Sequence, residues 1–346
     1  MQSSRKSVCA FLTTLGGALL VTALLNLTVN PYGHFPLRVL KPVVWSSRQD
    51  KVDWMATSFG RRPPQVLVLG SSRVMKIRST EIEQVSGKRA YNAGVDSGRV
   101  EDAYALFAYA RVLGAPLSDL VIGIDLDAFH DAVPTDARLL ATAQLRRFVP
   151  LDVRLDWYPR VAAGLVSYSQ ARDSLRSLSM AVRGYPPEVY RFDEDGFIHY
   201  LEWEPKIAAG TFRPDFEHSK EEYDSRFAQW GQVSPMRVEL LKKLVSEAAT
   251  QGIAVRAFLT PFHRSLIEHL RVTREFDRHR SEVTNVMVDL MNEHSNFSFM
   301  DFTEATSFGG ETERFLDGSH PDEENSARIV RALWTGRTVD AQHALQ

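Results

Sequence analysis

The sequence contains very little cysteine and almost no net charge. Cys9 is the only cysteine among 346 residues, which excludes an internal disulfide and any metal site made of several thiolates. It lies inside the first apolar segment, whereas the cysteine of a lipoprotein would follow such a segment. The formal net charge of -2 implies no strongly basic face, so the sequence gives no support for a nucleic-acid partner.

Motifs of cofactor-binding proteins are also missing. The chain has no Gly-x-x-x-x-Gly-Lys phosphate loop, and its histidines are scattered without the spacing of metal ligands. We therefore expect no metal and no organic cofactor. A hydrophobic content of 44% and a charged content of 24% are ordinary for a globular protein. The length accommodates one large or two modest domains.

One long apolar run is present, at residues 8–29, and it carries no charged side chain. At about 1.5 Å per helical residue, such a run crosses a hydrocarbon core of about 30 Å. Arg5 and Lys6 precede it and favour a cytoplasmic N-terminus, although basic residues soon after the run weaken this bias. A cleaved signal peptide is the alternative, but its apolar core is normally only about 7–15 residues long. We expect residues 1–30 to form the cytoplasmic N-terminus and a single-pass anchor in a bacterial inner membrane, with the rest of the chain in the periplasm.

After the anchor, the sequence predicts a connector followed by an α/β domain. Proline punctuates both ends of residues 31–64, which we assign to a juxtamembrane connector. From residue 65 to residue 346, buried-strand patterns alternate with helical ones, which predicts a parallel sheet with helices on both faces. The expected strands are residues 66–69, 119–125, 253–259 and 297–302, and the expected helices include 97–113, 235–250 and 265–292.

A stretch of about residues 135–232 breaks this alternation. It has two helical patterns and then Asp195-Gly196 between arms rich in Tyr and Phe, which is a hairpin signal. Because it falls between two expected core strands, we interpret it as a mostly helical insertion that forms a lid or a substrate platform.

Two short segments carry residues suited to nucleophilic catalysis. Ser72 follows Gly70 directly after the first buried strand, at the strand end where open α/β sheets place reactive groups. Asp317 and His320 lie three residues apart in a glycine-containing loop near the C-terminus. A serine hydroxyl needs a positioned base, and that base needs a carboxylate to hold its tautomer. An ordinary strand with a Ser-rich turn is the alternative interpretation.

These segments resemble the SGNH, or GDSL-like, serine esterases and acyltransferases. Gly70-Ser71-Ser72 stands where the family has its Gly-Asp-Ser block, so the resemblance makes Ser72 the nucleophile. Asp317-Gly318-Ser319-His320 is similar to the last block, which makes His320 the base and Asp317 its partner. Residues 91–98 look like the second block, whose glycine donates a backbone N–H to the oxyanion. Gly98 fits that role by its Ser-Gly context, and Gly94 is the competing choice. The resemblance covers about residues 65–130 and 250–335.

The third family block, Gly-x-Asn-Asp, is not matched. Here the strand ends Gly123-Ile124-Asp125, and an ionised carboxylate repels an oxyanion. The oxyanion hole must then depend on the backbone N–H groups of Ser72 and Gly98, or on Arg73, or the enzyme is weak. We also expect substrate contacts from residues near the reactive strand ends, namely Asn92, Asp125 and His263.

The combination of this pattern with an anchor looks closer to cell-envelope members of the family, such as the teichoic-acid D-alanyl transfer protein and the alginate O-acetyltransferases. The resemblance implies a membrane-anchored serine esterase or O-acyltransferase that acts on acyl esters of an envelope polysaccharide through an acyl-enzyme. Its partners would be an acylated glycan or acyl donor and a membrane-bound acyltransferase complex. The alternative is a non-catalytic envelope assembly protein that keeps the fold and binds a glycan or a partner protein.

Overall fold

The computed structural model describes residues 2–35, 39–43 and 46–336. The chain forms two compact units, each built from two separate stretches of sequence. Met1–Ser46 and Asp136–Glu188 make up the first, which we call the helical unit. Ser47–Thr135 and Val189–Gln346 make up the second, which we call the α/β unit.

A five-stranded sheet forms the centre of the α/β unit. Its strand order is β2-β1-β3-β6-β7, and all neighbouring strands are parallel. The apolar runs predict these strands because a sheet covered on both faces buries consecutive side chains. The four side chains of β1 have no exposed surface. The strand bounds are Val66–Leu69 (β1), Ala90–Asn92 (β2), Asp119–Ile124 (β3), Ala254–Leu259 (β6) and Phe297–Asp301 (β7).

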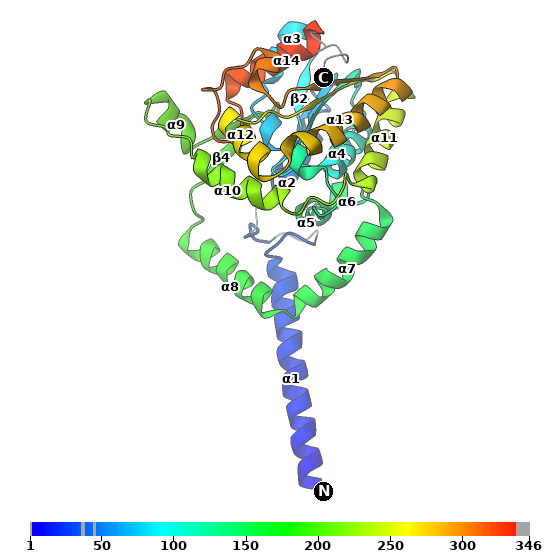
Figure 1. Ribbon diagram of the computed structural model, residues 1–346. Coiled ribbons are helices and arrows are strands. Elements are labelled where there is room, and N and C mark those ends of the chain that lie inside the picture. Colours follow the sequence, from blue (N-terminus) through cyan, green and yellow to red (C-terminus); the bar gives the residue numbers. More distant parts are fainter. Residues whose placement is uncertain (1, 36–38, 44–45, 337–346) are drawn as a thin grey trace. The chain divides into compact units, whose positions relative to one another are not determined.

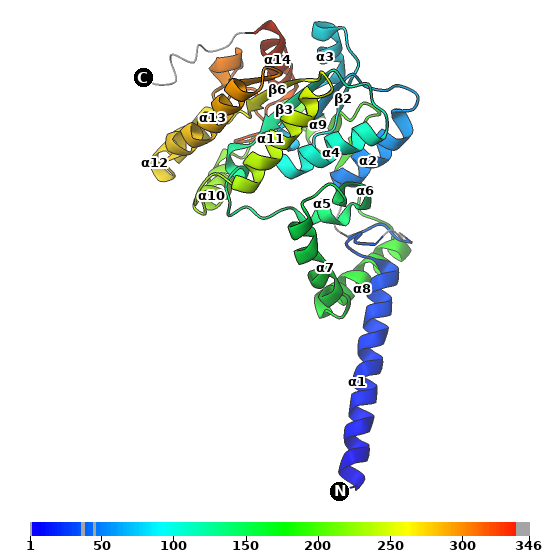
Figure 2. The same cartoon turned by 90° about the vertical axis from the view of Figure 1, so that its right-hand side faces the viewer.

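Helices flank this sheet, so the expected parallel α/β architecture is confirmed (Figures 1 and 2). Side chains of α3 and α14 share one buried cluster with β1, β3, β6 and β7. On the opposite face α4 and α11 pack against each other and against β1 and β6. The helix bounds in this unit are Ser47–Ser58 (α2), Ser79–Ser86 (α3), Val100–Val112 (α4), Trp203–Ala208 (α9), Phe216–Phe227 (α10), Pro235–Ala249 (α11), Arg264–Thr273 (α12), Phe276–Glu293 (α13) and Glu323–Thr335 (α14).

Two helix predictions need correction. The helix expected at residues 97–113 begins only at Val100, because Ser97 has a φ of 49° and the extended Arg99 caps the helix. The single helix expected at residues 265–292 is two helices, α12 and α13. Glu275 between them has a φ of 49°, a left-handed conformation that ends one helix and sets the direction of the next.

The helical unit contains α1 (Gln2–Val29), α5 (Ala137–Ala141), α6 (Ala143–Arg146), α7 (Leu151–Leu165) and α8 (Tyr168–Arg183). Within α1, Lys6–Val29 is long and apolar enough to cross a membrane. Both α7 and α8 contact α1, and they leave its C-terminal part in opposite directions (Figure 1). Asn26 joins the three helices: its amide donates to the carbonyl of Leu165 at 2.8 Å and accepts from the Ser174 hydroxyl at 2.8 Å.

The unit boundaries differ from the expected domain boundaries in two places. Within the expected connector at residues 31–64, α2 belongs to the α/β unit, where Val52 and Met55 are fully buried. The expected insertion at residues 135–232 is divided, because Asp136–Glu188 packs with α1 and only the remainder belongs to the α/β unit. The predicted hairpin is present in that remainder as β4 (Tyr190–Phe192) and β5 (Ile198–Tyr200).

Lys51 explains why α2 belongs with the α/β unit. Its buried ammonium donates to the carbonyl of Asn92 at 2.7 Å, and also to the carbonyl of Gly196 in the hairpin turn. It lies 4.1 Å from the ring centroid of Phe192. One side chain therefore ties α2 to the end of β2 and to the hairpin, although no sequence pattern links these three segments.

Candidate active site

The end of β1 places Ser72 at the reactive edge of the sheet. Gly70 turns the chain with a φ of 145°, and a Cβ atom there would approach the Gly123 carbonyl oxygen to 2.8 Å. Only glycine fits both constraints without strain. Ser71 follows as the N-cap of the 3₁₀ helix η1 (Ser72–Val74). Ser72 therefore stands beyond the carboxyl ends of β1 and β3, as the sequence predicts.

Ser72, His320 and Asp317 form a continuous hydrogen-bonded chain. Ser72 Oγ lies 2.8 Å from His320 Nε2. His320 Nδ1 lies 2.7 Å from Oδ2 and 2.9 Å from Oδ1 of Asp317. The backbone N–H groups of Ser319 and His320 also donate to the Asp317 carboxylate, at 2.8 and 2.9 Å. The carboxylate orients the ring so that Nε2 faces the serine hydroxyl, which is the arrangement a general base needs.

The electrostatics of this chain suit proton transfer. Burial acts to raise the pKa of Asp317, but the His320 ring and the two backbone N–H donors outweigh it and hold the pKa well below its ordinary value. Burial acts to lower the pKa of His320, and the Asp317 carboxylate outweighs it, so the pKa is raised above its ordinary value. The imidazole is thus a stronger base than a free histidine, and Asp317 stays ionised beside it.

The two glycines expected to donate to an oxyanion use their N–H groups elsewhere. The N–H of Gly98 donates to the Val95 carbonyl at 3.0 Å, and that of Gly94 donates to the Asn92 side chain at 2.9 Å. Gly98 still lies against the nucleophile turn, since a Cβ atom there would be 2.3 Å from the Gly70 carbonyl oxygen. Within the described part of the chain, the Ser72 N–H makes no hydrogen bond, so it is free to donate to an oxyanion.

Arg73 is held in a buried charge cluster behind the nucleophile. Its guanidinium donates to Asp127 Oδ1 at 2.5 Å and to Thr260 Oγ1 at 2.9 Å, and it also bonds the Tyr223 hydroxyl. Its Nε lies 3.7 Å from Asp125 Oδ2. These partners give the side chain a structural role in place of the expected oxyanion contact.

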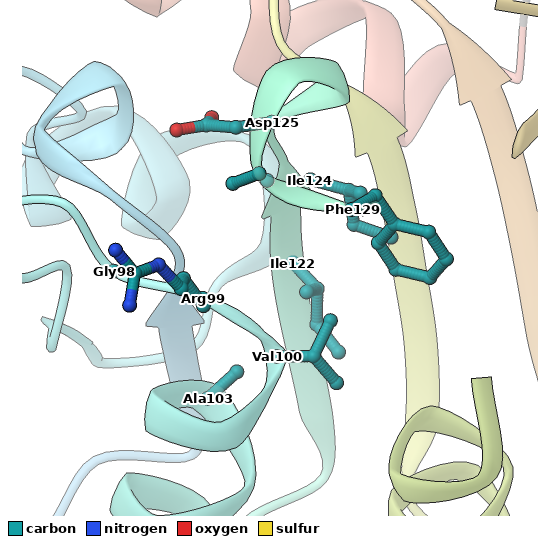
Figure 3. Close-up of a pocket in the computed structure, with 10 residues that line it drawn as sticks. Gly98, Arg99, Val100, Ala103, Ile122, Ile124, Asp125 and Phe129 are labelled. Carbon is teal, nitrogen blue, oxygen red and sulfur yellow. The ribbon is translucent and has the colours of Figure 1, made fainter. Parts of the chain in front are cut away.

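Asp125 follows β3 directly. Its Oδ1 accepts a hydrogen bond from Thr260 Oγ1 at 2.8 Å. Burial raises the pKa of Asp125, and the neighbouring Asp127 adds to this, while Arg73 opposes it. Asp125 also lines a small pocket of about 20 Å³ together with Gly98 and Arg99. Figure 3 shows Asp125 beyond the end of β3, with Gly98 and Arg99 on the segment that leads into α4.

A larger pocket shares these residues. It has a volume of about 290 Å³, close to the lower end for small-molecule sites, about 300 Å³. Besides Asp125, its walls include Gly98, Arg99, Arg226 and His130. Neither ring nitrogen of the buried His130 has a hydrogen-bond partner of good geometry among the described residues. The pocket thus offers polar and cationic groups beside the residue that follows β3.

Asn92 and His263, the other two residues expected to contact the substrate, instead support the structure around the site. Asn92 is fully buried, and its amide donates to the carbonyls of Val74 and Ile77 at 2.8 and 2.9 Å. It therefore fixes the nucleophile turn and is not accessible to a ligand. His263 caps α12, stacks on Phe216 at 4.0 Å, and its backbone N–H donates to the Gly318 carbonyl at 2.8 Å. It supports the loop that carries the base.

Helix α10 contributes residues that the sequence analysis missed. Ser219 Oγ accepts the Gly318 N–H at 3.0 Å, and a Cβ atom on Gly318 would be 2.6 Å from Ser219 Cβ. Tyr223 bonds Arg73, and burial raises its pKa, so its hydroxyl stays protonated. This helix lies in the expected insertion, and it connects the nucleophile turn with the loop of the base. No motif marks it, because the connection depends on tertiary packing.

No family model matches the chain, and no curated protein matches it. In residues 2–35, 39–43 and 46–336, no three His, Cys, Asp or Glu side chains come together as a metal site requires.

Arg73→Met should strongly destabilise the protein, because it removes the cation shared by Asp125 and Asp127. Breaking a buried ion pair by removing one partner costs about 3–5 kcal/mol. Arg226→Met is the matched control. Arg226 also bonds Asp127, at 2.7 Å, but its side chain is 39% exposed, so we expect a loss of at most about 1 kcal/mol. Denaturant unfolding of the full-length protein in detergent measures both, and equal losses would contradict the role assigned to Arg73.

Proposed function

We propose that this protein is a membrane-anchored serine esterase or O-acyltransferase of the SGNH type that acts on acyl esters of a cell-envelope polysaccharide. The observation that carries the proposal is the hydrogen-bonded chain from Ser72 Oγ through His320 to Asp317. These three residue types, in this order and at these distances, constitute the apparatus of acyl transfer through a serine nucleophile.

In the proposed reaction His320 Nε2 takes the hydroxyl proton of Ser72 while Oγ attacks the ester carbonyl. The tetrahedral intermediate collapses as the C–O bond of the leaving alcohol breaks, and His320 returns the proton to that oxygen. The result is an acyl-enzyme on Ser72. Water or a sugar hydroxyl then attacks the acyl carbon, with His320 again acting as the base, and Ser72 is released. Asp317 stays ionised throughout and stabilises the imidazolium.

The envelope setting is supported by α1 and by the resemblance of residues 65–130 and 250–335. Asn26 of α1 is fully buried and provides the partners of Leu165 and Ser174. Cleavage of α1 as a signal peptide would leave these groups unpaired, which argues for a retained anchor. Arg5 and Lys6 favour a cytoplasmic N-terminus and thus a periplasmic α/β unit. In this setting the pocket beside Asp125 would receive the sugar or the acyl donor, delivered by a membrane-bound acyltransferase complex.

One observation favours a second candidate, a non-catalytic binding protein. The N–H groups of Gly98 and Gly94 are already bonded, and Asp125 replaces the asparagine of the family. An oxyanion would then have the Ser72 N–H as its principal donor. Such a protein would keep the fold and bind a glycan in the pocket without cleaving it.

A fluorophosphonate probe distinguishes the two candidates. The full-length protein should be labelled on Ser72 and should hydrolyse a small chromogenic acetyl ester, while Ser72→Ala should lose both properties. Ser298→Ala is the control, because this exposed serine on β7 lies outside the hydrogen-bonded chain of Ser72, His320 and Asp317 and should leave labelling intact. An unlabelled, inert wild-type protein would reject the enzyme and favour the binding protein.

The rate of hydrolysis should rise with pH through a midpoint above 6.5. His320 acts as a base only when neutral, and its raised pKa moves that transition upward from the ordinary value of about 6.5. Asp317→Asn should lower the midpoint and reduce kcat by about 10⁴-fold, because the ring loses its orienting carboxylate. A pH profile of kcat/KM for the two proteins checks this, and a midpoint below 6.5 in the wild type would contradict it.

Asp125→Asn should raise kcat by about 10-fold or more, because an amide adds a donor where a carboxylate repels the oxyanion, and one such donor is worth about 10²–10³. Its oxygen can still accept from Thr260. Asp127→Asn is the matched control, since it removes a carboxylate from the same cluster and should give no increase. Steady-state kinetics on the acetyl ester decide the point, and equal decreases in both variants would show that Asp125 does not face the reacting carbonyl.

A further inference from the structure

Helix α8 has its polar and apolar faces reversed relative to a helix of a water-soluble protein. The buried side chains are Gln170, Ser174 and Ser177. The large apolar side chains point outward, and four of them lie at helical spacing on one stripe: Tyr168, Leu175, Leu178 and Val182. In water this arrangement would leave a continuous apolar face without cover.

Helix α7 carries a similar outward stripe. Leu151, Leu155 and Tyr158 follow one another at i, i+4 and i+7 and are all exposed, while Trp157 and Val161 are buried. The stretch Asp136–Glu188 contains nine of the exposed large apolar side chains, against eight on the much longer described part of the α/β unit. Outside α1, the exposed apolar side chains of the described residues are therefore concentrated on these two helices.

Contacts with α1 determine at which point along this membrane-crossing helix α7 and α8 are attached. Asn26 bonds Leu165 at the end of α7 and Ser174 in α8, and Tyr32 bonds Asp173 at 2.6 Å. Asn26 is 18 residues beyond Val8, where the uncharged run begins, which is about 27 Å along a helix. A hydrocarbon core of about 30 Å that begins near Val8 ends close to this residue. The junction of α7 and α8 thus lies at the boundary between acyl chains and headgroups.

Basic side chains border the apolar stripe of α8. Arg172, Arg176 and Arg183 fall on one side of it at helical spacing. Helices that lie in the interfacial plane of a membrane combine an apolar stripe with flanking Arg and Lys, which meet anionic headgroups. The charge pattern therefore agrees with the position given by Asn26.

We propose that α7 and α8 lie in the headgroup region of the bilayer that α1 crosses, with their apolar stripes inserted at the acyl boundary and the arginines of α8 against anionic lipid. The occupant of the exposed face is lipid, because the face continues the lipid-facing surface of α1 within the same compact unit. This inference is independent of the serine chemistry.

Site-specific fluorescence on the full-length chain tests the proposal. In a Cys9→Ser background, single cysteines replace Leu155 in α7, Leu175 in α8 or Val112 in α4, whose side chains are 57%, 59% and 58% exposed. Each is labelled with an environment-sensitive fluorophore and reconstituted in vesicles of phosphatidylcholine and phosphatidylglycerol, 3:1. Acyl-chain spin-labelled lipid serves as the membrane quencher and iodide as the aqueous quencher.

We expect labels at positions 155 and 175 to be quenched several-fold more strongly by the spin-labelled lipid than the label at position 112, and several-fold less by iodide. Equal iodide quenching at all three positions would overturn the proposal, because the stripes would then face water. Protection from iodide without quenching by lipid would overturn it as well, since a second copy of the chain would then cover the stripes.

Discussion

The structure depends on the placement of two carboxylates inside the α/β unit. Asp125 and Asp127 follow β3 in a place where neither is solvated, and Arg73, directly after Ser72, supplies the positive charge that makes this tolerable. Because Arg73 also bonds Tyr223 and Thr260, the same guanidinium connects the turn after β1 with the residue that follows β6 and with α10. The position of the nucleophile thus depends on the ion pairs that the next residue, Arg73, makes with these two carboxylates. The adjacent Ser72 keeps an unbonded N–H, and its hydroxyl is left to pair with His320.

The sequence was sufficient for the features that depend on local pattern. Patterns of consecutive residues predict the strand runs, the hairpin at Asp195-Gly196 and the apolar span at residues 8–29. The structure has all three. Ser72 and His320 were paired by their chemistry and by a resemblance, and the structure brings them to 2.8 Å although 248 residues separate them. The break at Glu275 was missed because a non-glycine residue in a left-handed conformation has no sequence signature.

The features that were missed depend on packing between distant segments. The contact of Ser219 with Gly318, and that of Lys51 with the hairpin turn, join side chains and backbone groups that carry no motif. The oxyanion donors proposed from the second block were uncertain for the same reason, since whether the N–H of Gly98 is free depends on how the loop folds. The division of residues 135–232 could not be predicted because it depends on the packing of α7 and α8 against α1, in which Asn26, one polar residue in an apolar helix, takes part.

The bonds of Asn26 also have a consequence for biosynthesis. Its partners Leu165 and Ser174 lie 139 and 148 residues further along the chain. A ribosome adds about 5–20 residues per second, so α1 is complete at least several seconds before α7 and α8 exist. During that interval the amide has no protein partner, and the apolar residues around it must carry α1 into the membrane alone. The helical unit is therefore the first part of the protein to begin folding, yet it cannot finish until the middle of the chain has been translated.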